Sequence, residues 1–424
     1  MAKRTVFRNG LRVITIPRSE SLTATVLVLV ETGSKYEEKK LSGISHFLEH
    51  MCFKGTKKRP RAIDISGELD ALGAKSNAFT THEFTGYFAK VDPEHLSRAI
   101  DIVSDIYLNQ VFRESEIKKE RGVIIEEINM YQDDPKRKLY DNFTKLLYGD
   151  QPAGWDVAGT KETVSRLSRK DFLAYRRAHY VGSATVIVVA GKFNEQKILQ
   201  LLKRSFASIS TGKKGVKAPT DDSQKRSAVA IEFKASDQTH LLFGARAFPA
   251  TDPRVSSLEV LTAVLGGGMS SRLFQRIREK MGAAYYVRAM ADLLTDHGYL
   301  AVATGSDTKR AQDVLRAIVD ECKKLTRTLV SAAELARAKE YLIGRISLDL
   351  ETTDQLTEFY GEQEVLKRSF RSPEAEIARV RAVSAKSVRE VARTIFRSER
   401  LNLALIGPVK GVKEKAFFER ILRV

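Results

Sequence analysis

One helix–strand–helix order recurs along the chain at a fixed distance, and this repetition constrains the fold more than any other feature. Ser168-Arg-Lys-Asp-Phe and Ser384-Ala-Lys-Ser-Val lie 216 positions apart, and Gly191 and Gly407 are separated by the same 216. Each glycine ends an apolar run typical of a buried strand, and a helical pattern follows. The repetition predicts a duplicated α+β domain, with chance agreement of two helix–strand units as the alternative.

A polar stretch separates the two copies. Residues Ser208–Ser227 contain lysines, glycines, serines, aspartates and a proline, with few apolar side chains. Such a composition is typical of a linker. We therefore expect an N-terminal domain over residues 1–208, a linker over 209–227 and a homologous C-terminal domain over 228–424.

Hydrophobic patterns predict the main elements of both copies. Expected strands cover residues 11–17, 23–32, 76–91, 184–190, 228–233, 240–248 and 401–406. Expected helices cover the segment after Ser42-Gly43, then residues 61–72, 93–109, 114–131, 136–147, 168–179, 256–265 and 271–280.

Composition excludes several classes of protein. Hydrophobic residues make up 43% of the 424 residues, and no apolar run approaches the roughly 18 residues that span a bilayer. The net charge of +18 is spread thinly, so we interpret it as a solvated basic surface and expect no nucleic-acid binding. The first residues lack the pattern of a secretory signal, and Cys52 and Cys322 are the only cysteines. Both observations favour a reducing cytoplasm.

The stretch His46-Phe47-Leu48-Glu49-His50 carries the clearest chemical signal. His46 and His50 are four residues apart, so on a helix they share a face and can bind one metal ion. Glu49 lies beside them, where it can polarise a metal-bound water. The order His-x-x-Glu-His is the signature of the inverzincins, which are zinc peptidases.

A catalytic zinc usually has three protein ligands, so one more is needed. The helix predicted over 114–131 contains Glu120 and Glu127, which are seven residues apart and share a face. Glu126 points about 100° away from Glu127. Carboxylates on a buried face need a cation or strong hydrogen bonds. Helical geometry alone leaves two interpretations open, a metal site and a surface helix with ordinary i,i+4 pairs.

With these residues the chain resembles the pitrilysin/insulinase family of zinc peptidases, most closely the short-chain branch that includes mitochondrial processing peptidase and bacterial single-subunit peptidases. The family pattern places 76 residues between the motif and its third ligand, and 76 residues separate His50 from Glu127. The resemblance implies one Zn²⁺ per chain bound by His46, His50 and Glu127, with Glu49 as the base and Glu120 in support. It also implies two tandem α+β domains of the processing-peptidase-like metallohydrolase fold, each a mixed, mostly antiparallel sheet packed with helices.

A second segment carrying the resemblance is Gly73–Thr80, which is similar to the edge strand that receives substrate in the family. The resemblance implies that Asn77 and Ala78 hold the peptide backbone. The physical logic is β-augmentation, in which an extended peptide adds a strand to a free sheet edge. An ordinary residue at the start of a strand is the alternative interpretation of Asn77.

A third segment lies in the second half of the chain. Arg278 and Tyr285 resemble the family's Arg-x6-Tyr pair, which hydrogen-bonds the substrate near the scissile bond. Ala283 stands where relatives often have Leu, and Tyr286 is an adjacent competitor for the tyrosine role. The alternative interpretation is an arginine in a surface ion pair and a tyrosine in the core. The preceding glycine run, Gly266–Gly268, lacks a following Gly-Lys-Ser/Thr, so we reject a nucleotide site.

We therefore expect a zinc endopeptidase that hydrolyses unfolded peptides or oligopeptides in a closed dimeric chamber. One chain has both the zinc motif and the Arg–Tyr pair, which favours a homodimer whose protomers complete each other's sites. A non-catalytic structural or assembly subunit of the same family is the main alternative, and a basic peptide- or RNA-binding protein is a second. The remaining histidines lack ligand-like spacing and are interpreted as structural: His82, His95, His179, His240 and His297.

Overall fold

The chain divides into two compact units, and each half of the sequence gives one segment to the unit formed mainly by the other half. The computed structural model describes residues 2–409 and 412–422. Unit 1 consists of the residues up to Asn129, Trp155–Ala218 and Asp349–Ser372. Unit 2 consists of Met130–Gly154, Pro219–Leu348 and the residues from Pro373 onward. The domain limits expected from the sequence do not include this exchange and stay a prediction.

Unit 1 contains a six-stranded sheet and the helices that cover it. Its strands are β1 (Lys3–Val6), β2 (Arg12–Pro17), β3 (Ala24–Val30), β4 (Lys75–Thr80), β5 (Thr85–Val91) and β6 (Thr185–Gly191). Its α-helices are α1 (Ile44–Cys52), α2 (Ala62–Ala71), α3 (Leu96–Leu108), α4 (Glu114–Asp133, whose last residues belong to unit 2), α6 (Lys161–Arg166), α7 (Arg169–His179), α8 (Glu195–Ser205) and α12 (Thr353–Lys367).

Unit 2 contains a five-stranded sheet. Its strands are β7 (Ala228–Phe233), β8 (Gln238–Arg246), β9 (Ala284–Leu293), β10 (Gly298–Asp307) and β11 (Leu401–Gly407). Its helices are α5 (Pro135–Tyr148), α9 (Val255–Gly266), the π-helix η6 (Phe274–Lys280), α10 (Ala311–Arg327), α11 (Ala332–Leu348), α13 (Pro373–Ala382), α14 (Ala385–Ile395) and α15 (Val412–Leu422).

Apart from β1, which extends the edge of the first sheet, the two sheets share one strand order. Strand order is β1-β2-β6-β3-β5-β4 in unit 1 and β7-β11-β8-β10-β9 in unit 2. Among the strands of residues 2–409 and 412–422, the parallel pairs are β2 with β6 and β7 with β11, in matching places. The prediction of two homologous domains with mixed, mostly antiparallel sheets is therefore confirmed.

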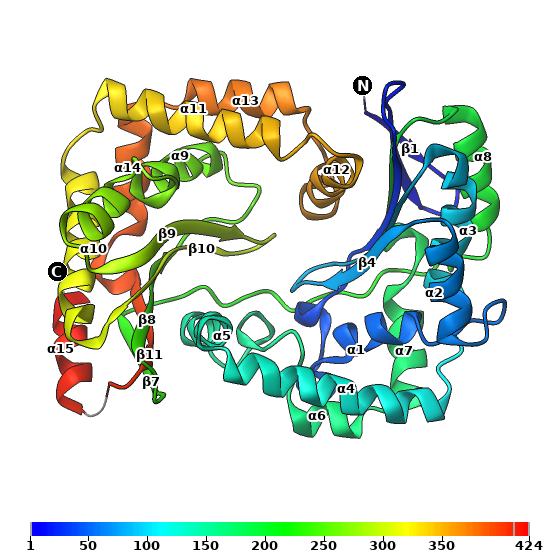
Figure 1. Ribbon diagram of the computed structural model, residues 1–424, viewed down its shortest axis with the longest axis horizontal. Coiled ribbons are helices and arrows are strands. Elements are labelled where there is room, and N and C mark those ends of the chain that lie inside the picture. The colour runs from blue at the N-terminus through cyan, green and yellow to red at the C-terminus, as the bar shows by residue number, and fades with distance from the viewer. Residues whose placement is uncertain (1, 410–411, 423–424) are drawn as a thin grey trace. The chain divides into compact units, whose positions relative to one another are not determined.

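Central strands are buried on both faces, which explains their continuous apolar sequences. In β3, Val26 and Val28 point into the core formed with α1 and α3, whereas Leu27 and Leu29 point into a second core under α12. The equivalent second face in unit 2 is covered by α5 (Figure 1). The two exchanged segments thus supply the helix that covers the second face of each sheet.

A hairpin replaces the single long strand predicted over residues 76–91. β4 and β5 are joined by a turn in which the Thr81 hydroxyl accepts the backbone N–H of Glu83 and of Phe84 and donates to the carbonyl of Phe84, at 2.8–3.2 Å. The residues on both sides of this turn have a strand-like pattern, so the sequence pattern alone did not indicate the turn. Because of the hairpin, β4 lies at the edge of the sheet, and β5 is its one partner within residues 2–409 and 412–422.

The first part of the connection between the two sequence copies is bound to unit 1. Residues 212–227 form neither helix nor strand. Lys214 Nζ lies 2.7 Å from a carboxylate oxygen of the buried Glu31, and Lys217 pairs with the buried Glu83. In residues 2–409 and 412–422, no helix is both long and apolar enough to cross a bilayer.

Candidate metal centre

Helix α1 presents the His-x-x-Glu-His motif, and its start is fixed by a carboxylate. Gly43 is the N-cap residue, within the Ser42-Gly43 pair that precedes the predicted helix. The oxygens that accept the N–H groups of Gly43 and Ser45 come from Glu37, at 2.8 Å each. Burial raises the pKa of Glu37 to about 7. Gly43 has a φ of 93°, and a Cβ there would lie 2.5 Å from the carbonyl oxygen of Ala158, so only glycine fits.

Three side chains predicted to bind metal converge at one point. The ligand atoms of His46, His50 and Glu127 all lie within 4.8 Å of one another. Oε2 of Glu127 is 3.7 Å from Nε2 of His46 and 3.5 Å from Nε2 of His50. Ligands placed about 2.1 Å from a tetrahedral zinc ion are about 3.4 Å apart. The three residues therefore fit a zinc ion without rearrangement of the backbone.

Glu120 lies behind this cluster and holds one of its histidines. Its Oε1 is 2.8 Å from Nδ1 of His50, and its Oε2 is 2.7 Å from Nζ of Lys54. Burial raises the pKa of Glu120, but the bonds from His50 and Lys54 outweigh this and hold it below its usual range. A charged carboxylate accepts the Nδ1 proton and leaves Nε2 of His50 directed at the site, as outer partners of metal ligands commonly do.

Glu49 borders the same site with a buried carboxyl group. Its side chain accepts a hydrogen bond of 2.6 Å from the hydroxyl of Thr80. Burial raises the pKa of Glu49, which makes it a stronger proton acceptor once ionised. Beside it opens a cavity of about 490 Å³, lined by Glu49, His50, Lys54 and Glu120 together with apolar residues of α2.

Asn77 and Ala78 lie on β4 and also line this cavity. They pair across the hairpin with Phe88 and Tyr87. Since no other strand in the described part of the chain pairs with the second side of β4, its outward N–H and C=O groups form a free edge. The structure therefore brings the expected peptide-binding strand to the expected metal site, within one unit.

Arg278 and Tyr285 lie together in unit 2. The Arg278 guanidinium is 5.3 Å from the ring centre of Tyr285 and 4.8 Å from that of Phe274. Tyr285 is 81% exposed, so it is not a core residue. The hydroxyl of Tyr286 forms a hydrogen bond of 3.0 Å with Nδ1 of His240, which also belongs to unit 2. Of the two adjacent tyrosines, Tyr285 is the one whose side chain faces outward.

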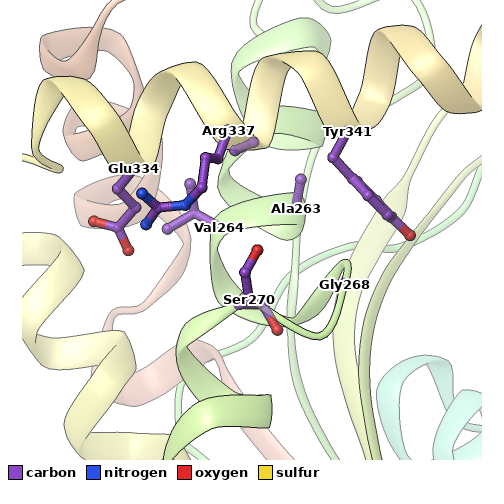
Figure 2. Close-up of a pocket in the computed structure, with 9 residues that line it drawn as sticks. Ala263, Val264, Gly268, Ser270, Glu334, Arg337 and Tyr341 are labelled. Atoms are coloured by element: carbon purple, nitrogen blue, oxygen red, sulfur yellow. The ribbon is translucent and has the colours of Figure 1, made fainter.

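The helix expected over residues 271–280 is a π-helix from Phe274 onward. Ahead of it, the glycine run borders a cavity of about 20 Å³, room for roughly one water molecule. Figure 2 shows Ser270 facing this cavity from the loop, with Glu334, Arg337 and Tyr341 along the helix above it.

Two residues beside the candidate metal site, Lys54 and Thr80, were not predicted from the sequence. Lys54 lies two positions beyond the end of α1, so helical spacing does not place it, and its position is seen only from its contact with Glu120. Thr80 is 31 positions from Glu49, and only the hairpin brings it near. Among the described residues, no other group of three metal-ligating side chains was found.

Comparisons with known proteins agree with this architecture. Residues 12–161 match the family model "Insulinase (Peptidase family M16)", and residues 166–342 match "Peptidase M16 inactive domain". The uncharacterized zinc protease YmxG of Bacillus subtilis is 34% identical over 409 residues, covering 96% of this chain and 98% of that protein.

Solved structures show the same fold at lower identity. A protease from Helicobacter pylori superimposes with a TM-score of 0.91 at 22% identity, covering 96% of this chain and 99% of the other. A chain of complex III2 from Candida albicans gives a TM-score of 0.86 at 18% identity, covering 99% of both chains. Matches to both family models and to a full-length relative at 34% identity show that this protein belongs to peptidase family M16.

Proposed function

We propose that the protein is a zinc-dependent endopeptidase that hydrolyses unfolded peptides or oligopeptides, with one Zn²⁺ per chain. The observation that carries this proposal is the convergence of His46, His50 and Glu127 at zinc-like spacing. The names of relatives as zinc proteases support the choice of metal. A zinc ion at this site would lower the pKa of a water molecule and polarise the scissile carbonyl.

The chain's own residues supply the remaining chemistry. Glu49 accepts a proton from the attacking water and returns it to the leaving amine nitrogen. Glu120 keeps His50 in the orientation that the metal requires. The free edge of β4, with Asn77 and Ala78, pairs with the extended peptide backbone.

We further infer a homodimer in which Arg278 and Tyr285 of one copy act on the substrate at the metal site of a second copy. There they would donate hydrogen bonds to the oxyanion that develops at the scissile carbonyl. The exposure of Tyr285 and its contact with Arg278 support this role. Mixing Glu49→Gln chains with Arg278→Ala chains tests it, because each mixed dimer regains one intact composite site. No recovery of activity above either parent would contradict it.

Cleavage of a quenched, unstructured peptide library by the zinc-loaded protein tests the peptidase proposal itself. Activity sensitive to a chelator, restored by zinc and absent in Glu49→Gln is the expected result. A non-catalytic subunit keeps the fold but has no need of the ligand set. A zinc-replete preparation that cleaves no peptide would overturn the peptidase proposal and favour that alternative.

A further inference from the structure

The carboxylate of Glu49 is anchored by a residue of the edge strand. The hydroxyl of Thr80 donates to Oε2 of Glu49 at 2.6 Å. Within residues 2–409 and 412–422, this is the only hydrogen bond to the Glu49 carboxylate. Oε1 is therefore the oxygen that remains for a proton of the attacking water. Glu49 is only 8% exposed, so water contributes little to holding its carboxylate in one orientation.

Thr80 itself occupies a fixed position. It is the last residue of β4 and pairs with Thr85, which hydrogen-bonds through its hydroxyl to the carbonyl of Thr32 at 2.9 Å. The next residue is Thr81, whose hydroxyl closes the turn. Thr80 is also β-branched, which restricts its χ1 angle. A donor held from both sides is suited to orient a flexible carboxylate.

Strand geometry places this donor on the correct face. Side chains alternate along β4, so Ala78 and Thr80 point to one face and Phe79 to the other. Ala78 packs against the core that includes α1, whereas Phe79 packs against the core under α12. The strand that offers a free edge to a peptide therefore also holds the general base.

We propose that Thr80 is a positioning residue that fixes Oε2 of Glu49, aims Oε1 at the attacking water and links peptide binding on β4 to the orientation of the base. This inference rests on the proposed peptidase function. A peptide paired with β4 restrains that strand and hence the hydroxyl of Thr80. The effect on the rate then falls on kcat, because Thr80 acts on the proton transfer rather than on binding of the peptide.

Thr80→Val and Thr80→Ser separate positioning from packing. Valine keeps the shape and removes the donor, so kcat should fall about tenfold to a hundredfold, the usual range for a hydrogen bond to a charged group. KM should stay within about twofold, and zinc content should remain one per chain. Serine keeps the donor and should retain kcat within about threefold.

Thr15→Val is the matched control. The hydroxyl of Thr15 also donates to a glutamate, Oε1 of Glu195, at 2.7 Å on the same sheet. Loss of this hydrogen bond should leave kcat and KM unchanged. Such a result would show that removing a threonine–glutamate hydrogen bond from this sheet does not by itself reduce activity. Crystals of zinc-loaded Thr80→Val should show the Glu49 carboxylate in more than one orientation, independently of any activity.

Two outcomes would overturn the role of Thr80. One is an active wild type whose Thr80→Val variant keeps the same kcat. The other is a single, wild-type Glu49 orientation in zinc-loaded Thr80→Val, whether or not the protein cleaves peptides. If valine at this position prevents folding, Thr80→Ala is measured in its place. Failure of the zinc-loaded wild type to cleave any peptide instead overturns the proposed function.

Discussion

Units 1 and 2 have the same order of five strands, with β1 added in unit 1, yet the helix at one equivalent place differs in chemistry between them. The helix after β3 is α1, which carries two histidines and a glutamate. The helix after β8 is α9, whose buried residues include Leu258, Leu261 and Leu265. One topology therefore places possible metal ligands on this helix in one copy and mostly apolar buried side chains in the other. A few side chains, and not the fold, determine the chemistry.

The edge strands differ in a related way. β4 and β9 both end their sheets, and each follows a glycine with positive φ, Gly73 at 58° and Gly282 at 55°. Counting from these glycines, Tyr285 in β9 stands where Ser76 stands in β4. Unit 1 thus offers small side chains on its edge beside a cavity, whereas unit 2 offers an exposed aromatic ring beside an arginine.

The largest expected effect comes from removing Glu127, the proposed third metal ligand, which belongs to unit 1. Glu127→Gln should lose zinc and reduce peptide cleavage by about a thousandfold or more, because both water activation and carbonyl polarisation depend on the metal. Metal analysis and cleavage of a quenched peptide measure this. Glu126→Gln is the matched control, since Glu126 is an exposed neighbour on the same helix.

Hydrogen exchange extends this test to both units. Binding of zinc to wild type should slow exchange in α1 and α4, which carry the ligands, and leave α9 and α11 unchanged. Equal protection of α9, or zinc retained by Glu127→Gln, would contradict the assignment of the metal to unit 1 alone.

A second prediction concerns the helices exchanged between the units. Glu364 on α12 has a fully buried side chain that pairs with Arg12 and Arg4 at 3.0 Å each. Glu364→Gln removes one of the two carboxylates that pair with the buried charge of Arg12. The substitution should lower the free energy of unfolding by about 3–5 kcal/mol. Phe143 on α5 is held by apolar contacts alone in its core, and Phe143→Ala should cost about 3–5 kcal/mol through a cavity.

Urea unfolding with hydrogen exchange distinguishes the two variants by location. Glu364→Gln should increase hydrogen exchange in unit 1, and Phe143→Ala should increase it in unit 2. Glu358→Gln on the same face-covering helix α12 serves as a control, since no salt bridge to Glu358 is present among the described residues. If either variant increases hydrogen exchange equally in both units, α12 and α5 do not stabilise their own sheets independently.

The shared helix face of His46 and His50 could be predicted from local geometry, whereas contacts that depend on long-range strand pairing could not. His46 and His50 share a helix face whatever the surrounding fold, and the spacing to Glu127 follows from the resemblance to the family. The bond between Thr80 and Glu49 depends on a hairpin that the alternating pattern of residues 76–91 conceals. The exchange of α5 and α12 was equally hidden, because an apolar helix face does not specify which sheet it covers.

The smallest expected effect tests whether the two copies still share their turn geometry. Gly73 and Gly282 both have left-handed backbone, and a Cβ at either position meets nothing within 4 Å. Substitution by alanine is therefore penalised by the backbone conformation alone, at about 1 kcal/mol of unfolding free energy in each unit. Urea unfolding of Gly73→Ala and Gly282→Ala measures the two costs.

Each unit also offers a control with the opposite sign. Gly67 in α2 and Gly344 in α11 lie in helices, and a Cβ there also meets nothing within 4 Å. Alanine at either should stabilise the protein by about 0.5–1 kcal/mol, because it restricts the unfolded chain. A cost at Gly73 without a matching cost at Gly282 would mean that the approach to β9 has diverged from that to β4. The alignment of Tyr285 with Ser76 would then lose its structural basis.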